Sequence, residues 1–307
     1  MDRYFKYLSP GAAVPTVTNG TLRWSRPARF NDLFDMSVPF STDFDIDILT
    51  PRTLDLMWER VTHPGRKPVI NKLSIALEEH REAFLALGKQ KFMEDMRVGV
   101  EQSLRQLPAI LEKFAEELMD HLSTVKVLCL SSVNDDNGMW GLYAGDNQGL
   151  VLEFANQPGL DSVFRLAKPI NYSDRPPSML TDEAMSEFMA GDRKLDEKIA
   201  DPLMYYKTTR WRDERELRLV SGEGRLPSKE VEDVRFHPRE LIAVYFGARS
   251  ATLREQLEPT VRRKYPHAKL WQAVKGKAMR IEFVSIEETV EQRDTRYGPL
   301  SDTLGTP

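Results

Sequence analysis

The stretch Trp211-Arg212-Asp213-Glu214-Arg215-Glu216-Leu217-Arg218-Leu219-Val220 carries the pattern that decides the fold. Polar and apolar residues alternate along it, and successive side chains of a strand point to opposite faces of a sheet. We therefore predict a strand that turns its two leucines to a core and Glu214, Glu216 and Arg218 to a cleft. Two carboxylates would then stand side by side on an exposed face, next to an arginine that favours their ionised form.

Paired carboxylates of this kind suit a specific chemistry. They can stabilise a cationic, oxocarbenium-like centre, or they can bind a ribose hydroxyl. A solvated charged face on an edge strand has the same alternation. The other motifs of the chain have to separate these two interpretations.

The composition is that of an ordinary globular protein. The chain has 307 residues, of which 41% are hydrophobic and 29% are charged, so it can bury a substantial core. A net charge of −4 gives no overall basic field for nucleic acid or anionic membranes. No apolar run has the length of a signal peptide or of a membrane-spanning helix, so we expect a cytoplasmic protein without membrane association.

The cysteine and histidine content predicts no metal site. Cys129 is the single cysteine and lies in an apolar run, which is typical of a core residue rather than a nucleophile. The five histidines are scattered and form no HExxH spacing. Neither GxxxxGK[ST] nor a GxGxxG after a strand occurs, so we expect no standard nucleotide-binding loop.

The order of elements predicts an α+β fold with a mostly antiparallel, split sheet. Strands are expected at 4–8, 21–25, 125–130, 149–154, 163–166, 170–172, 217–221, 241–246, 269–274 and 281–285. Further helices are expected at 181–200 and 250–264. The sheet would thus be formed by both ends of the chain.

Residues 51–124 are predicted to be a helical insertion in this sheet. Helices are expected at 51–62 and 69–87, and apolar residues then recur every three or four positions. Pro108 is expected to divide this last stripe into two helices. Because no Gly/Ser linker flanks the insertion, we predict a single domain over 1–290, followed by a polar tail at 291–307.

Several further motifs are distributed over nearly the whole chain. They are Tyr4-Phe5-Lys6-Tyr7, Arg29-Phe30-Asn31-Asp32-Leu33-Phe34-Asp35, Leu128-Cys129-Leu130-Ser131, Met139-Trp140-Gly141-Leu142-Tyr143-Ala144, Gly149-Leu150-Val151-Leu152-Glu153-Phe154, and Lys207 with the opening stretch. In this order they resemble the bacterial family called domain of unknown function 2971. Leu33 stands where that family often has proline.

The order of motifs is also similar to that of mono-ADP-ribosyltransferases, with a basic residue, a serine and a Glu-x-Glu strand in succession. This resemblance implies an NAD-dependent ADP-ribosyltransferase or NAD glycohydrolase of the defence or toxin type, with NAD as substrate and no metal. Glu216 would bind the ribose, Glu214 would act on the acceptor side, and Ser131 would orient the carboxylate. Ser131 could alternatively be a strand-end cap.

The resemblance also implies residues that bind the rest of NAD. Lys6 or Arg29 would hold a phosphate, and Trp140 or Tyr143 would stack on nicotinamide. Lys6 stands where histidine or arginine is usual, and both cations could be simple surface charges. The two aromatic residues, three positions apart, could instead face the core.

A non-catalytic or nucleic-acid-directed module of a bacterial defence system is the second interpretation. The helical insertion would then be an interaction surface. A basic groove formed by Lys207, Arg210, Arg212, Arg215 and Arg218 would favour it. A pocket that brings Glu216 within reach of Ser131 would favour the enzyme. The expected partner is a protein or a nucleic acid, which would be the acceptor if the protein is a transferase, and the oligomeric state is open.

Overall fold

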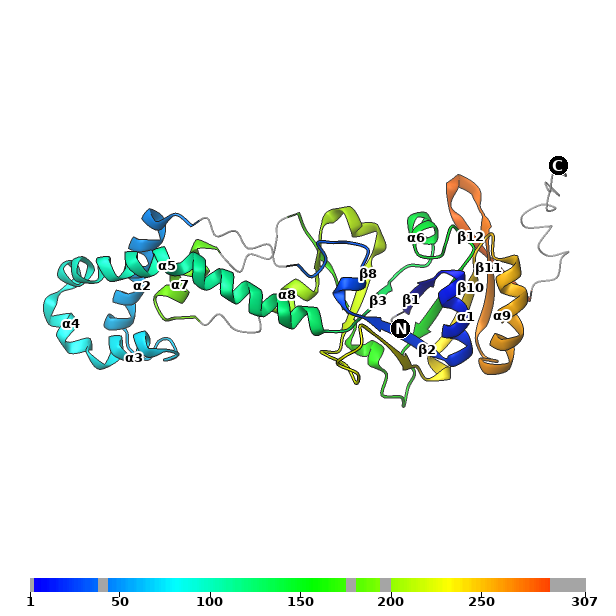
Figure 1. Ribbon diagram of the computed structural model, residues 1–307, viewed down its shortest axis with the longest axis horizontal. Helices are drawn as coiled ribbons and strands as arrows, with labels where there is room; N and C mark the ends of the chain where they lie inside the picture. The colour runs from blue at the N-terminus through cyan, green and yellow to red at the C-terminus, as the bar shows by residue number, and fades with distance from the viewer. Residues whose placement is uncertain (1–2, 38–43, 175–180, 194–199, 288–307) are drawn as a thin grey trace. The chain divides into compact units, whose positions relative to one another are not determined.

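The computed structural model describes residues 3–37, 44–174, 181–193 and 200–287, and its contacts divide the chain into two compact units (Figure 1). The sheet unit comprises Met1–Asn31, Val125–Tyr172 and Lys207–Pro307. The helical unit comprises Asp32–Thr124 and Ser173–Tyr206. The sequence predicts one domain with an insertion at 51–124, so the helical part is larger than expected and includes a second segment. The predicted tail at 291–307 lies outside the described residues.

The sheet unit contains a ten-stranded, mostly antiparallel sheet, which confirms the predicted α+β class. Its strands are β1 (Arg3–Leu8), β2 (Thr21–Ser25), β3 (Val127–Ser131), β4 (Leu150–Ala155), β5 (Lys168–Pro169), β8 (Glu216–Val220), β9 (Val231–Arg235), β10 (Leu241–Phe246), β11 (Lys269–Lys275) and β12 (Ile281–Ser285). Among the described strands of this sheet, β10 and β11 pair in parallel and the other pairs are antiparallel. The short strands β6 (Asn171–Tyr172) and β7 (Tyr206–Lys207) pair separately.

The main sheet splits between β1 and β3. The strands follow the order β12-β11-β10-β4-β1-β3-β2-β9, and β8 pairs along the whole of β3. By contrast, β1 pairs with β3 only where Phe5 lies opposite Ser131. The remaining backbone groups on this side of β3 therefore need partners other than β1.

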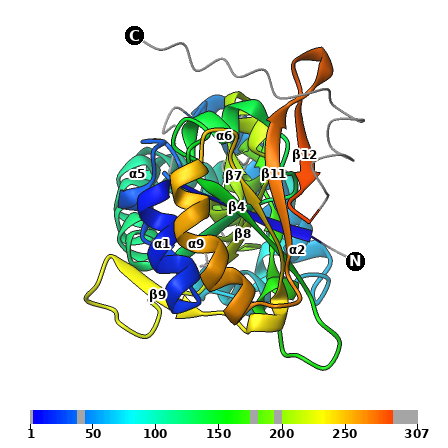
Figure 2. The same cartoon turned by 90° about the vertical axis from the view of Figure 1, so that its right-hand side faces the viewer.

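The two faces of the sheet carry different side chains. Alternate residues of β1, β4 and β10 build a large apolar core under α1 (Pro10–Asn19) and α9 (Ala251–Lys264), which lie side by side (Figure 2). The Tyr265 hydroxyl links these two helices by donating to the Val17 carbonyl at 3.0 Å. The opposite face carries Phe5 and Tyr7 under α6 (Asn137–Leu142).

Several local predictions for the sheet unit are wrong. Residues 209–214 form the 3₁₀ helix η4 (Thr209–Glu214), so Glu214 is not on the strand as the alternation predicts, whereas β8 at Glu216–Val220 lies within one residue of the strand expected at 217–221. The predicted strand at 163–166 is also a 3₁₀ helix, η2 (Val163–Leu166). The sequence pattern missed α1 and β9, because Gly11 and Pro15 in α1 and the charges of β9 conceal their periodicity. The remaining short helices are η1 (Pro27–Arg29), η5 (Pro238–Glu240) and η6 (Lys277–Met279).

The helical unit is built around one long helix. Its helices are α2 (Ile46–Thr62), α3 (Lys72–Glu79), α4 (Arg81–Leu87), α5 (Lys89–Thr124), α7 (Asp182–Met189) and α8 (Ala200–Met204). The predicted helix at 69–87 is two helices, with His80 at their junction. The helix expected from 51 starts at Ile46, because the Asp45 carboxylate caps its first turn. Residues 194–199 of the helix expected at 181–200 lie outside the described residues.

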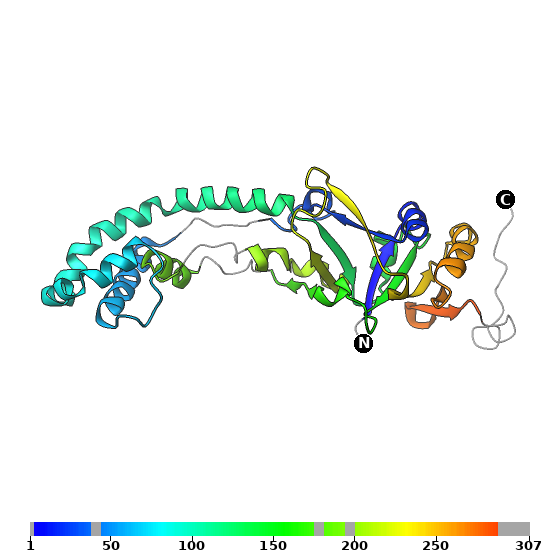
Figure 3. The same cartoon turned by 90° about the horizontal axis from the view of Figure 1, so that it is seen from below.

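Pro108 does not divide the apolar stripe, contrary to the sequence prediction. α5 is one continuous helix of 36 residues, drawn as a single curved ribbon in Figure 3. A proline inside a helix costs about 3 kcal/mol. Leu104, Leu107 and Leu111 around it are buried, and burial of each contributes about 1.5–3 kcal/mol. Side-chain burial therefore outweighs the local helix-breaking tendency.

Arg60 of α2 links the segments of the helical unit. Its guanidinium donates to Asp192 Oδ1 at 2.7 and 3.1 Å and to Glu78 Oε1 at 2.7 Å. Lys67 Nζ lies 2.5 Å from the second carboxylate oxygen of Asp192. The Arg60 and Asp192 side chains are only 1% and 2% exposed, so each buried charge depends on the other.

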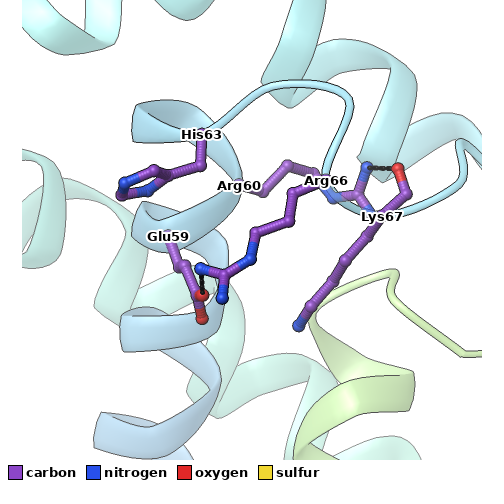
Figure 4. Close-up of a pocket in the computed structure, with 5 residues that line it drawn as sticks. All are labelled: Glu59, Arg60, His63, Arg66 and Lys67. Carbon is purple, nitrogen blue, oxygen red and sulfur yellow. Dashed lines mark hydrogen bonds and ion pairs between the residues drawn. The ribbon is translucent and has the colours of Figure 1, made fainter.

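A small pocket lies beside this ion pair, lined by Glu59, Arg60, His63, Arg66 and Lys67 (Figure 4). Its volume of about 10 Å³ leaves room for a single water. The Arg66 side chain in the same view pairs with Glu59 at 2.9 Å and is mostly exposed. The pocket is therefore a small packing gap and not a ligand site. The buried pair of Arg60 with Asp192 can be compared with the exposed pair of Arg66 with Glu59.

Replacement of Arg60 by Met should destabilise the protein by about 3–5 kcal/mol, because it removes the buried cation that binds both Asp192 and Glu78 and leaves the buried Asp192 carboxylate with the half-buried Lys67. Arg66→Met should cost less than about 1 kcal/mol, because the pair with Glu59 is exposed to solvent. Urea unfolding followed by far-ultraviolet circular dichroism measures both. Equal effects of the two substitutions would show that Arg60 has no special role in the helical unit.

Candidate active site

Cross-strand pairing places Glu216 on the face of the sheet that carries Phe5. Ser131 of β3 lies opposite Phe5 on one side and opposite Glu216 of β8 on the other. Residues opposite each other share a face, so Ser131 and Glu216 lie on this side of the sheet. On the other face Leu219 is buried in the apolar core and Leu217 packs against it, as the alternation predicts.

The two predicted carboxylates are held by two buried cations. Arg218 binds Glu216 Oε1 through Nε at 2.9 Å and through a terminal nitrogen at 2.8 Å. Lys207 Nζ lies 2.7 Å from Glu214 Oε2 and 3.4 Å from Glu216 Oε2, so one ammonium joins both acids. We call these four residues the ion cluster. The expectation of exposed carboxylates is wrong, since Glu214 and Glu216 are only 8% and 4% exposed.

A tight turn brings the Glu214 carboxylate close to Glu216 and Lys207, although Glu214 precedes the strand. Arg215 has φ of 43°, a left-handed conformation that connects η4 to β8. The Ser131 hydroxyl donates to the Glu214 carbonyl at 2.7 Å and accepts from the Val133 amide at 3.1 Å. The predicted role of Ser131 is therefore corrected: it holds the backbone of the turn, while the cations orient the Glu216 carboxylate.

Aromatic and amide groups surround the ion cluster. The Tyr143 hydroxyl donates to Glu214 Oε1 and accepts from Asn31 Nδ2, the latter at 2.9 Å. Lys207 Nζ lies 4.6 Å from the centre of the Trp211 ring, within the range of a cation–π contact. Asn31 is exposed and Tyr143 and Trp211 are half-buried, so on this side the cluster comes closest to solvent.

The environments push the pKa values of the two acids in opposite directions. Burial raises the pKa of Glu214, and this effect exceeds the opposing effects of Lys207 and Tyr143. Burial also acts to raise the pKa of Glu216, but Arg218, Lys207 and a hydrogen bond from the Cys129 thiol outweigh it, so the net pKa is lowered. Glu216 therefore stays ionised, whereas Glu214 can exchange a proton more readily. Such a separation is typical of carboxyl pairs that divide acid–base work.

Lys6 fills the split between β1 and β3. Its ammonium donates to the Cys129 carbonyl at 2.7 Å, a group that β1 does not pair with. Burial lowers the pKa of this lysine. The geometry thus gives Lys6 a structural role in the sheet in place of the expected phosphate contact.

Two other predicted binding residues lie away from the ion cluster. Trp140 is fully buried, and its indole donates to the Asn134 carbonyl at 2.6 Å while its ring packs edge-on against Tyr7. It is a core residue, so the stacking role predicted for it is wrong. Arg29 is exposed and lies 3.7 Å from Glu230. Of the four residues expected to bind NAD, Tyr143 is the one that contacts the ion cluster.

Some residues of the site were missed by the sequence pattern. The sequence indicates Asn31 and Trp211 only as parts of motifs, and Lys207 as part of a motif and as a possible groove cation. Tyr172, whose hydroxyl accepts from the Glu216 amide at 2.8 Å, gave no signal at all. Burial raises the pKa of Tyr172 to about 12. The one signal that could have found Lys207 was its short distance in sequence from the Glu-x-Glu motif.

No family model matches this chain, and no curated protein or solved structure matches it either. In the described part of the chain, no helix combines the length and apolar character needed to cross a membrane. Across the same ranges, His, Cys, Asp and Glu side chains form no group of three that could hold a metal ion. The interpretation of the site therefore depends on its geometry.

The opposite pKa shifts predict different pH dependences for two Gln variants. Glu216, with its lowered pKa, stabilises the fold above about pH 4.5, and this contribution is lost as pH falls through the folded pKa. Glu214, with its raised pKa, contributes fully below about pH 4.5 and loses that contribution as pH rises through its folded pKa.

Urea unfolding between pH 4.5 and 7 measures how far the free energy of unfolding of each variant lies below that of wild type. This difference should be constant for Glu216→Gln and should become smaller with rising pH for Glu214→Gln. Parallel pH dependences of the two variants would contradict the assignment of opposite shifts.

Cys129 should react slowly with iodoacetamide in the folded protein. Burial raises the pKa of its thiol, and the thiolate is the reactive form. Mass spectrometry after labelling at pH 8 should show little alkylation in buffer and complete alkylation in urea. Rapid labelling of the native protein would mean that the strand carrying Cys129 opens readily.

Proposed function

We propose that the sheet unit cleaves the bond between nicotinamide and ribose in NAD, as an ADP-ribosyltransferase-like enzyme or an NAD glycohydrolase. One observation supports this most: Glu214 and Glu216 share Lys207, yet their pKa values are shifted in opposite directions. The reaction needs one carboxylate that stays charged and one carboxyl group that exchanges a proton.

Glu216 suits the first of these roles. When the bond to nicotinamide breaks, its electron pair leaves with the nicotinamide nitrogen and positive charge develops on the ribose. An ionised carboxylate in a desolvated site stabilises such charge strongly, because little water screens it. Arg218 and Lys207 keep Glu216 ionised before substrate binds.

Glu214 suits the second role. The ribosyl cation is attacked by the oxygen of water or by a nucleophilic group of an acceptor, which must lose a proton. Glu214 can accept this proton, since its raised pKa makes it the better base of the two. Because the Tyr143 hydroxyl donates to Glu214, this contact has to open when a substrate reaches the carboxyl group.

The nucleic-acid-directed alternative has less support from the geometry. Of the five cations proposed to form a basic groove, Lys207 and Arg218 are buried in the ion cluster. The other three, Arg210, Arg212 and Arg215, are exposed, but the acidic Asp213 lies between them in the sequence. We infer that the enzyme is the better interpretation, with a protein or nucleic acid as acceptor and the defence or toxin role as part of the same proposal.

Nicotinamide release from NAD tests the proposal, with water and then cell lysate as acceptor. Glu216→Gln should reduce release by about 100-fold or more, because it removes the charge that stabilises the ribosyl cation. Glu214→Gln should lower transfer to an acceptor by about 100-fold and nicotinamide release by less.

The chain offers a matched control in the same sheet. Glu153 is also buried and also accepts a tyrosine hydroxyl, that of Tyr245 at 2.6 Å. Glu153→Gln should lower the melting temperature and leave the specific activity of the folded protein unchanged. The proposal fails if wild type neither binds nor turns over NAD, and the assigned site fails if Glu216→Gln is fully active.

A further inference from the structure

A second polar feature lies next to the ion cluster in the sheet unit. A pocket of about 250 Å³ is lined by Val133 and residues 135–137, by Asp213 and Arg215 on either side of Glu214, and by Arg280 before β12. Asp213 and Arg215 are the sequence neighbours of Glu214. A ligand in this pocket would therefore touch the turn that carries the proton-exchanging acid.

The pocket is lined by charged side chains of both signs that form no ion pairs with other described residues. Asp135, Asp213, Arg215 and Arg280 all line it. Within the described ranges, the ion pairs of 4.0 Å or less include none of these four side chains. This distinguishes the pocket from the ion cluster, where every charge has a partner. Asp136 is different, because its carboxylate caps α6 by accepting from the Met139 amide at 2.8 Å.

The backbone beside both arginines has unusual conformations, although Arg280 itself is extended. Arg215 itself is left-handed, and Arg280 directly follows Ala278 and Met279, whose φ angles are 55° and 58°. The Asn137 side chain donates to the Met279 carbonyl at 2.8 Å and so connects two walls of the pocket. Non-glycine residues keep such conformations only where their surroundings enforce them, and they are frequent at ligand sites.

We infer, on the basis of the proposed function, that this pocket binds the nicotinamide mononucleotide half of NAD. That half carries a positive pyridinium ring and a negative phosphate. Asp135 and Asp213 are complementary to the ring, and Arg215 and Arg280 are complementary to the phosphate. The volume is slightly below the range of about 300–1,000 Å³ of pockets for whole drug-sized ligands, which fits half of a dinucleotide.

Isothermal titration calorimetry with three probes tests the assignment. Nicotinamide mononucleotide carries both charges, nicotinamide riboside only the positive ring, and AMP only the phosphate. Nicotinamide mononucleotide should bind at least tenfold more tightly than either of the others. Arg280→Gln should weaken its binding about tenfold without affecting the riboside, and Asp213→Asn should weaken the riboside without affecting AMP. Arg239→Gln, an exposed arginine elsewhere in the sheet unit, should change nothing.

The outcomes separate this inference from the proposed function. Specific binding of nicotinamide mononucleotide, lost in Arg280→Gln, supports the pocket even if wild type releases no nicotinamide. If Glu216→Gln abolishes nicotinamide release but Arg280→Gln binds nicotinamide mononucleotide as wild type does, the pocket assignment is wrong and the reaction stands. Binding of the mononucleotide no tighter than that of AMP also overturns the inference.

Discussion

The Lys207 ammonium lies between the carboxylates of Glu214 and Glu216, and the polar face of the sheet depends on this contact. Two buried carboxylates close together cannot both ionise without nearby cations. Arg218 supplies a second cation to Glu216. The unequal distribution of two cations over two acids is the physical reason that one acid stays charged while the other has a raised pKa.

The sheet topology explains why such a cluster occurs at this point. One face of the sheet is an apolar core under α1 and α9, so charged groups can lie only on the other face or in the split. Where β1 leaves β3, the Cys129 carbonyl has no strand partner, and Lys6 supplies one. Glu216 and Arg218 of the ion cluster lie on β8, the strand that pairs along all of β3.

The sequence was sufficient for the periodic parts of this arrangement. Alternation correctly separates Glu216 from Leu217 and Leu219, because that pattern follows from strand geometry alone. The left-handed turn at Arg215 could not be predicted, since it depends on hydrogen bonds from the distant Ser131 and on contacts of Ser132 with the Arg215 carbonyl. Burial of Glu216 was missed for the same reason: it depends on Lys207, whose side-chain direction no local pattern shows.

Burial also limits what a loss of activity can prove. Removal of Lys207, Glu216 or Arg218 leaves an uncompensated charge inside the protein, which costs about 3–5 kcal/mol. The stability of the fold is thus sufficient to explain why the protein contains all three charged residues, whether or not they act on a substrate. Glu214 differs, because its raised pKa means that a neutral side chain is tolerated there more easily. Substitution of Glu214 or Tyr143 can therefore test catalysis with a smaller effect on folding. Substitution of Lys207 affects folding and catalysis together, because its ammonium binds both acids.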